Sequence, residues 1–147
     1  MRMQELMSTD VETLSPNDRV ADARQKMSLH RIHHLVVMER ADVLGVVSSR
    51  DLKGVPAETP IADVMSSEAI TADASTTVRR AANLLRGHII GCLPIVDGRK
   101  LVGIVTISDL LTLVGTGAER PVEQGKRWTL KHRGPRRVQE RRAARTR

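Results

Sequence analysis

The spacing of hydrophobic positions in residues 7–52 changes part-way along from a helical to a strand-like pattern. Val20, Ala23 and Met27 recur at intervals of three and four residues, which predicts one apolar face of an amphipathic helix. Two short apolar runs follow, at residues 35–38 and 43–47, with a charged turn between them. This arrangement predicts a β-hairpin after the helix.

Shorter elements are expected on both sides of the helix and hairpin. A short strand is predicted near residues 11–14, followed by a Ser-Pro-Asn-Asp turn at residues 15–18 that suits a helix N-cap. After the hairpin, a short helix is predicted to begin near Ser48 and to end by Gly54. The predicted element order is therefore β-α-β-β-α.

The whole pattern returns in residues 65–110, at a constant offset of 58 and without a gap. Twelve of the aligned pairs are identical, among them Gly45/Gly103 and Asp51/Asp109, whereas ordinary composition gives about three matches by chance. An internal duplication of this kind predicts two copies of one structural unit. We expect them to form a pseudo-symmetric pair with clefts between the halves.

The second copy predicts the same elements with stronger turn signals. Thr76 or Thr77 is expected to cap a helix whose apolar face extends to Ile89. Strands are predicted at 92–96 and 101–105 around an Asp-Gly turn, which is a strong hairpin signal. A last helix is predicted from about residue 108 to 114, ending at a Gly-Thr-Gly sequence.

Chain length predicts that the two copies pack on each other. Each copy has about 55 residues, too few to bury a comfortable core alone. We expect an α+β fold with one repeat in residues 1–56, a second in 57–117 and a tail in 118–147. Tyr and Phe are absent and there is a single Trp, so the core and any ligand cleft must be lined by aliphatic side chains.

Positive charge is concentrated in the tail. Residues 1–117 contain 13 Lys and Arg against 14 Asp and Glu, whereas residues 118–147 contain 11 against 3. With few aliphatic residues, the tail is predicted to be largely disordered in isolation. It serves either as a solubilising end or as a contact for nucleic acid. The basic residues that would make this contact are Lys126, Arg127, Lys131, Arg133, Arg136, Arg137, Arg141 and Arg142.

Several classes of protein are disfavoured by the sequence. Cys92 is the only cysteine, which rules out an internal disulfide and a cysteine zinc site. Because no signal peptide or membrane-spanning apolar run is visible, we expect a cytoplasmic protein that does not bind membranes. No catalytic constellation or metal site is predicted, since His33 and His34 lack suitably spaced partners.

The sharpest motif is Gly-x-x-Ser/Thr-x-x-Asp, which occurs once in each repeat where the second hairpin strand ends. It places Ser48 before Asp51 and Thr106 before Asp109. A helix N-terminus at this point would offer unpaired N–H groups to a phosphate, and the carboxylate would accept from the hydroxyls of a ribose. The same residues also match a capping box, in which they satisfy the helix end. Both interpretations stay open from the sequence.

Residues 3–115 resemble a tandem pair of cystathionine-β-synthase (CBS) domains, a Bateman module. The resemblance depends on the Asp-Val-Met-Ser sequence at 63–66, the Leu-Pro-Ile-Val-Asp strand at 93–97 and the Leu-Val-Gly-Ile-Val-Thr-x-x-Asp-Leu sequence at 101–110. It implies two β-α-β-β-α repeats packed sheet to sheet about a pseudo-twofold axis. Such modules commonly pair again, so we expect a disc-like homodimer.

The resemblance also implies a ligand site in each cleft, for AMP, ADP, ATP or S-adenosylmethionine. Asp51 and Asp109 match the ribose-binding acids, and adenine would lie against aliphatic side chains. The remaining residues implied in the two sites are Ser48, Arg50, Thr106, Ser108, His33, His34, Ile32, Val46, Ile90, Ile104, Met7 and Met65.

The two sites are expected to differ in charge. The first repeat has Arg50, His33 and His34, whereas the aligned positions of the second have no charged side chain. Charged phosphates are therefore expected to favour the first site. Alternatively, Arg50 fills the cleft itself or pairs with Asp51 and blocks it.

These observations favour a regulatory module, not an enzyme, that senses an adenosine-containing ligand and transmits the signal to a protein partner. The ligand would be regulatory, and no cofactor is required. The alternative is a nucleic-acid-associated protein that dimerises through the repeats and binds through its tail.

Overall fold

The computed structural model describes residues 1–116, which form two three-stranded sheets with helices on their outer sides. The helices are α1 (Met3–Leu6), α2 (Val20–His30), the 3-10 helix η1 (Ile61–Asp63), α3 (Val78–His88) and α4 (Ile107–Gly115). The first sheet consists of β1 (Thr13–Leu14), β2 (His34–Glu39) and β3 (Asp42–Ser48), and the second of β4 (Ala72–Asp73), β5 (Cys92–Asp97) and β6 (Lys100–Thr106).

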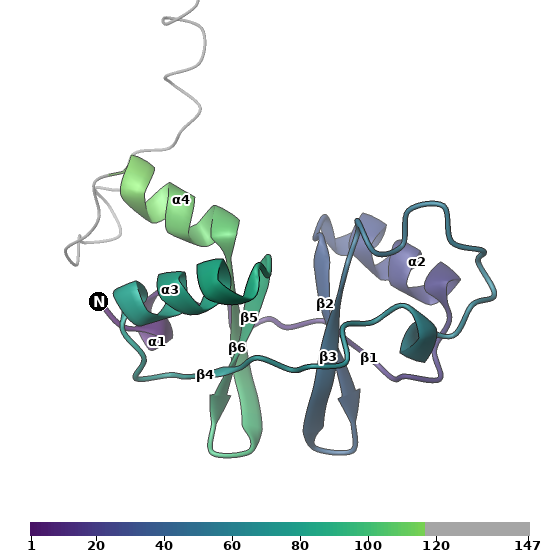
Figure 1. Cartoon of the computed structure of the whole chain (residues 1–147), viewed down its shortest axis with the longest axis horizontal. Coiled ribbons are helices and arrows are strands. Elements are labelled where there is room, and N and C mark those ends of the chain that lie inside the picture. The colour runs from purple at the N-terminus through teal and green to yellow at the C-terminus, as the bar shows by residue number, and fades with distance from the viewer. Residues whose placement is uncertain (117–147) are drawn as a thin grey trace, which may run out of the picture.

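Each sheet has the same strand connections, so the predicted duplication is confirmed. In the first, β1 runs parallel to β2, and β2 pairs with β3 as an antiparallel hairpin. The second sheet repeats both pairings with β4, β5 and β6. Figure 1 shows the two hairpins side by side at the centre of the molecule, with α2 and α3 on opposite outer sides.

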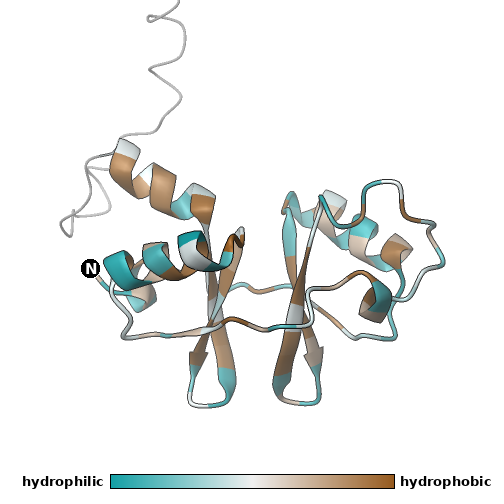
Figure 2. Ribbon diagram, viewed as in Figure 1, coloured by the Kyte–Doolittle hydropathy of each residue, from teal (hydrophilic) through white to brown (hydrophobic). Residues whose placement is uncertain are grey.

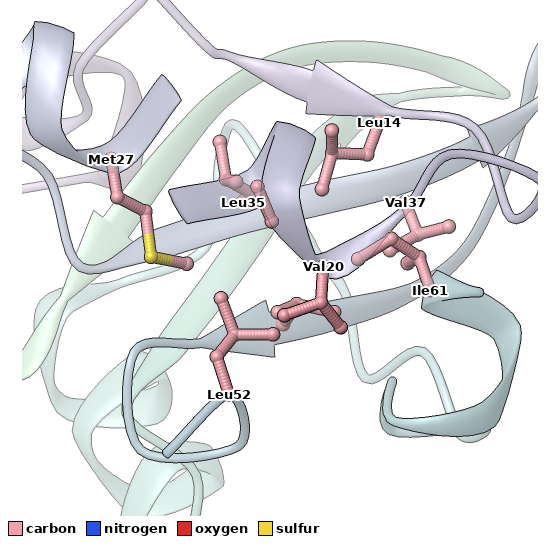
Figure 3. Close-up of a cluster of buried hydrophobic side chains, with 9 residues drawn as sticks. Leu14, Val20, Met27, Leu35, Val37, Leu52 and Ile61 are labelled. Atoms are coloured by element: carbon pink, nitrogen blue, oxygen red, sulfur yellow. The ribbon is translucent and has the colours of Figure 1, made fainter. Parts of the chain in front are cut away.

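Each sheet buries both of its faces. Leu35 and Val37 point into the core beneath α2, where they meet Val20 and Leu52 (Figure 3). Because successive side chains of a strand point to opposite faces, Val36 faces away from this core. It is nevertheless fully buried, as is its counterpart Pro94 in β5. The face of each sheet that points away from its helix is therefore buried too, as predicted for two sheets that pack on each other.

Two short segments, residues 2–8 and 60–66, cross between the repeats, and we name them the lead segments. Met3, at the start of the chain, is fully buried in the core of the second sheet, where its backbone N–H donates to Thr76 O over 2.9 Å. Ile61 is fully buried in the core of the first sheet, and its N–H donates to Asp18 O over 2.8 Å. Each half of the fold is therefore completed by residues that precede the other repeat.

Three expectations about helices were wrong in detail. The helix predicted from Ser48 to Gly54 is a series of turns, in which the N–H groups of Asp51 and Lys53 donate to carbonyls only three residues back. The N-cap of α2 is Arg19, and not a residue of the turn at 15–18. Ile89 does not extend the apolar face of α3, since it ends the helix in the left-handed region, with a φ of 54°, and is 92% exposed.

Within residues 1–116, the structure contains no helix that is both long and apolar enough to cross a membrane. In the same range, no cluster of three side chains suitable for holding a metal ion occurs. The predicted tail and all of its candidate nucleic-acid residues lie outside the described residues.

Candidate functional site

The turn after β6 places Thr106 and Asp109 in a reciprocal capping arrangement. The Thr106 N–H donates to Asp109 Oδ2 over 2.8 Å, and the Asp109 N–H donates to Thr106 Oγ1 over 3.2 Å. The Thr106 hydroxyl also contacts Oδ2, at 3.0 Å. These bonds satisfy two N–H groups at the start of α4. Among the described residues Asp109 Oδ1 accepts no hydrogen bond, so one carboxylate oxygen is left for another donor.

The turn after β3 repeats this arrangement without a helix behind it. The Ser48 N–H donates to Asp51 Oδ2 over 2.8 Å, and the Asp51 N–H lies 3.3 Å from Ser48 Oγ. Capping is thus present in both repeats, and in both it uses Oδ2 alone. Capping and ligand binding are consequently compatible at these aspartates, because the second oxygen remains unused within the described chain.

The lead segments bring a serine and a methionine beside each turn. Ser66 donates its N–H to Val46 O over 3.0 Å, and Ser8 donates to Ile104 O over 3.0 Å. Both bridges meet the strand that leads into a Ser/Thr-x-x-Asp turn. Close approach requires the motif glycine here, since a Cβ at Gly103 would lie 2.5 Å from Met7 Sδ. Each candidate site is therefore built from one repeat and the lead segment of the other.

The expected aliphatic residues divide between the two sites. Ile32 and Met65 pack against the core of the first sheet, and Ile90 and Met7 against the core of the second. Val46 and Ile104 are half-buried on the inner faces of β3 and β6. Only Val46 and Ile104 therefore point toward the other sheet, along the line where the two sheets meet, which we name the seam.

His34 occupies the seam itself. Its imidazole lies so close to Gly91 of the second repeat that a Cβ there would be 2.6 Å from Nε2. Burial lowers the pKa of His34 below its usual 6.5, and repulsion from His33 lowers it further, while Asp51 acts in the opposite direction. Burial at the seam thus favours the uncharged form of the His34 imidazole.

Asp51 also affects Cys92, the counterpart of His34 in the second repeat. Burial raises the pKa of the Cys92 thiol to about 12, and the negative charge of Asp51 adds to this rise. The carboxylate of Asp51 therefore lies close enough to the seam to shift the pKa of His34, which begins β2, and of Cys92, which begins β5. The thiol stays protonated and packed.

The remaining polar candidates are exposed. Arg50, His33 and Ser108 all face solvent, and Arg50 forms no salt bridge with Asp51 among the described residues. Arg50 instead borders a hollow of about 640 Å³ on the α2 side of the first repeat. The other lining residues, which include Arg24 and Lys53, were not among the sequence candidates.

Sequence reasoning missed the crossing of the lead segments and therefore the roles of Ser8 and Ser66. These residues are identical in the two repeats, but a repeat signal does not say which half a segment packs against. It also missed Arg24, because a basic residue on a helix normally belongs to the solvated face.

Comparison with known proteins identifies the fold unit. The family model described as the CBS domain matches residues 3–58 and 61–115. A relative, the CBS domain-containing protein YhcV of Bacillus subtilis (strain 168), is 33% identical over 114 residues, covering 74% of this chain and 81% of that protein. The inosine-5′-monophosphate dehydrogenase of Thermoplasma acidophilum is also 33% identical, but this chain spans only 23% of its length.

Among solved structures, the CBS domain pair of protein MJ0100 in complex with 5′-methylthioadenosine and S-adenosyl-L-methionine is similar in fold. It superposes with a TM-score of 0.74 at 26% identity and covers 81% of this chain and 98% of that one. The two sheets with the same strand connections agree with these matches. The chain therefore belongs to the CBS domain family and contains two CBS domains in tandem.

Proposed function

We propose that this chain is a regulatory module that binds an adenosine-containing ligand at the seam between its two CBS domains. The proposal is carried by the composition of each site, in which a Ser/Thr-x-x-Asp turn of one repeat adjoins the lead segment of the other. A ligand held there touches both repeats. The MJ0100 pair, which binds 5′-methylthioadenosine and S-adenosyl-L-methionine, supports this class of ligand.

Binding at a seam gives a direct route to regulation. A ligand shifts an equilibrium only if it favours one arrangement over another. A ligand that contacts both repeats binds more tightly to one arrangement than to another, because the relative position of the repeats changes how many contacts it makes. A protein partner that recognises one arrangement would then respond to the ligand.

Substitution of the aspartates tests the assignment. Asp109→Asn keeps an oxygen that accepts from the Thr106 N–H, but loses the charge and the second acceptor that suit a ribose diol. We expect calorimetry with AMP, ATP and S-adenosylmethionine to show at least about tenfold weaker binding at the second site, because a lost hydrogen bond to a charged group costs about 1.5–3 kcal/mol. The same change at Asp51 is expected to affect the first site.

Asp97→Asn, at the exposed end of β5, is the matched control and should bind as the unmodified chain does. If Asp109→Asn and Asp51→Asn both retain full affinity for every ligand, the aspartates are caps only and the proposal fails.

Self-association is the second part of the proposal. Leu111 and Val114 of α4 are 66% and 64% exposed, and Ile107 is 44% exposed. Figure 2 shows most of α4 coloured as hydrophobic. A contiguous apolar surface of this kind marks an interaction site. At the equivalent positions the first repeat has Lys53, Pro56 and Ser49, so a second copy would pair through the α4 faces.

The charge distribution favours one alternative function, binding of nucleic acid through the tail. Deletion of residues 118–147 is expected to abolish a gel shift that weakens steeply with added salt. A gel shift retained after the deletion excludes the tail as the contact.

A further inference from the structure

The hollow beside α2 exists because the first repeat lacks a last helix. In the second repeat, α4 begins directly after β6 and packs against α3. The first repeat has only turns at the equivalent place, ending at Gly54 and Pro56. These turns pack on α2 through Leu52 and bond to Arg24, but among the described elements no helix lies beside α2 as α4 lies beside α3. The hollow there measures about 640 Å³, within the range of pockets that hold small molecules.

Three positive charges surround this hollow. It is lined by Arg24, Met27, Ser49, Arg50, Leu52, Lys53 and Gly54, with no carboxylate in the lining. Within residues 1–116, none of the three basic side chains forms a salt bridge. The apolar members, Met27 and Leu52, are buried beneath the basic ones. The three cations therefore have no direct carboxylate partner in the described part of the chain, although Asp51 lies in the same turn as Arg50 and Lys53.

The second repeat has none of these charges at the aligned positions. An offset of 58 aligns Arg24 with Ala82, Arg50 with Ser108 and Lys53 with Leu111. All three lie on the same small surface although they come from α2 and from a turn far along the chain. The charges therefore distinguish the first repeat as a group.

Arg24 is already held in place. Its Nη2 atom donates to Leu52 O over 2.8 Å and to Val55 O over 2.6 Å. These bonds fix the guanidinium against the turn that also contains Arg50 and Lys53, and they leave the other guanidinium nitrogens for a ligand. A positioned arginine loses little further freedom on binding an anion, and its planar donors suit phosphate oxygens.

We propose that the hollow of Arg24, Arg50 and Lys53 is a binding site for a small, multiply charged phosphorylated metabolite. A chain of linked phosphoryl groups matches three adjacent cations better than one carboxylate does. The site goes beyond the proposed function, because its ligand needs no adenosine and Arg50 is the only residue that it shares with the seam sites. The phosphoryl groups come either from a nucleotide or from an inorganic chain of phosphates.

Inorganic tripolyphosphate is the probe, measured by calorimetry on the full chain at fixed ionic strength. We expect binding, with Lys53→Leu and Arg24→Ala each weakening it at least about tenfold, since each removes a charge-assisted contact. Both substitutions introduce the residue found in the second repeat. Lys53→Leu is the safer variant, because Lys53 makes no side-chain hydrogen bond within residues 1–116. Arg86→Ala, an exposed position on α3, is the matched control.

The outcomes separate this site from the others. Equal tripolyphosphate affinity in Lys53→Leu, Arg24→Ala and Arg86→Ala would overturn the proposal and assign binding to a part of the chain outside the hollow. The absence of any tripolyphosphate binding by the unmodified chain would overturn it too. Adenosine and ATP form the remaining arms of the experiment. Weaker ATP binding in Lys53→Leu, with unchanged adenosine binding, identifies a nucleotide as the source of the phosphoryl groups. If Lys53→Leu weakens the binding of tripolyphosphate but not of ATP, the source is an inorganic chain of phosphates. If tripolyphosphate binding at the hollow fails while adenosine still binds, this proposal fails and the proposed function at the seam stands.

Discussion

At the scale of single residues, the seam is defined by a contact between unlike partners. His34 faces Gly91, and its counterpart Cys92 is buried on the other repeat. An exact duplicate would place the same side chain on both sides. Because the second repeat has Cys92 where the first has His34, a single imidazole fills a space that two imidazoles could not share. The seam is therefore asymmetric although the backbone is nearly repeated.

The buried imidazole predicts a loss of stability in acid. Since the folded protein holds the pKa of His34 below 6.5, the unfolded chain binds a proton there at a pH where the folded chain does not. His34 has no effect on the free energy of unfolding well above pH 6.5. As the pH drops from 6.5 towards the lower pKa of His34 in the folded protein, the free energy of unfolding falls. Urea unfolding at pH 7.5 and 5.5 should show a smaller loss in His34→Gln than in the unmodified protein.

His88→Gln, at the exposed end of α3, controls for the removal of a histidine. An identical loss of stability in His34→Gln and His88→Gln would contradict a buried, neutral His34.

At the scale of elements, the lead segments are the feature that joins the halves. Periodicity and turn residues predicted both hairpins, α2, α3 and α4 to within one or two residues, because these signals are local. The last helix of the first repeat was predicted from Ser48 to Gly54, and this segment instead forms turns. The crossing of the lead segments depends on contacts between residues far apart in sequence, such as Met3 with Thr76 and Ile61 with Asp18, and no local pattern encodes it.

The candidate site was predictable to a similar degree. The Ser/Thr-x-x-Asp turns were visible in the sequence, and their capping bonds follow from spacing alone. Whether Asp51 and Asp109 also hold a ligand is not encoded in that spacing. The basic hollow was hidden for a different reason, since it requires Arg24 of α2 to meet a distant turn and requires a helix to be missing.

Removal of the Met3 side chain tests the crossing. Met3 is fully buried in the second core, so Met3→Ala is expected to lower the free energy of unfolding by about 2–5 kcal/mol. Urea unfolding measures this change. Gln4→Ala, the exposed neighbour on the same helix, is expected to stay within about 0.5 kcal/mol. Equal stability of the two variants would mean that residues 2–8 do not pack on the second sheet in solution.

At the scale of the whole molecule, the two repeats present different outer surfaces. The second repeat exposes apolar side chains on α4, and the first exposes positive charge around its hollow. Self-association through like surfaces therefore favours the second repeat, since two basic hollows facing each other would repel. Twofold pairing of identical patches is the commonest arrangement of homodimers.

Leu111→Lys tests this pairing by introducing the residue that the first repeat has at the equivalent position. We expect a dimer of the unmodified chain to dissociate, because a charge would be buried at the contact. Sedimentation velocity measures the mass. Leu29→Lys is the control, since Leu29 is 74% exposed on α2, away from α4. If both variants sediment like the unmodified chain, α4 is not the interface.

The reciprocal placement of Met3 and Ile61 has a consequence for how the protein is made. During synthesis from the N-terminus, the first hairpin emerges before Ile61, which completes its core, and Met3 packs on strands that are translated much later. Neither half is then a finished folding unit on the ribosome. A nick between the repeats would leave each fragment with an exposed core and with a short peptide that docks on the other fragment. The two fragments, supplied separately, should consequently reassemble better than either survives alone.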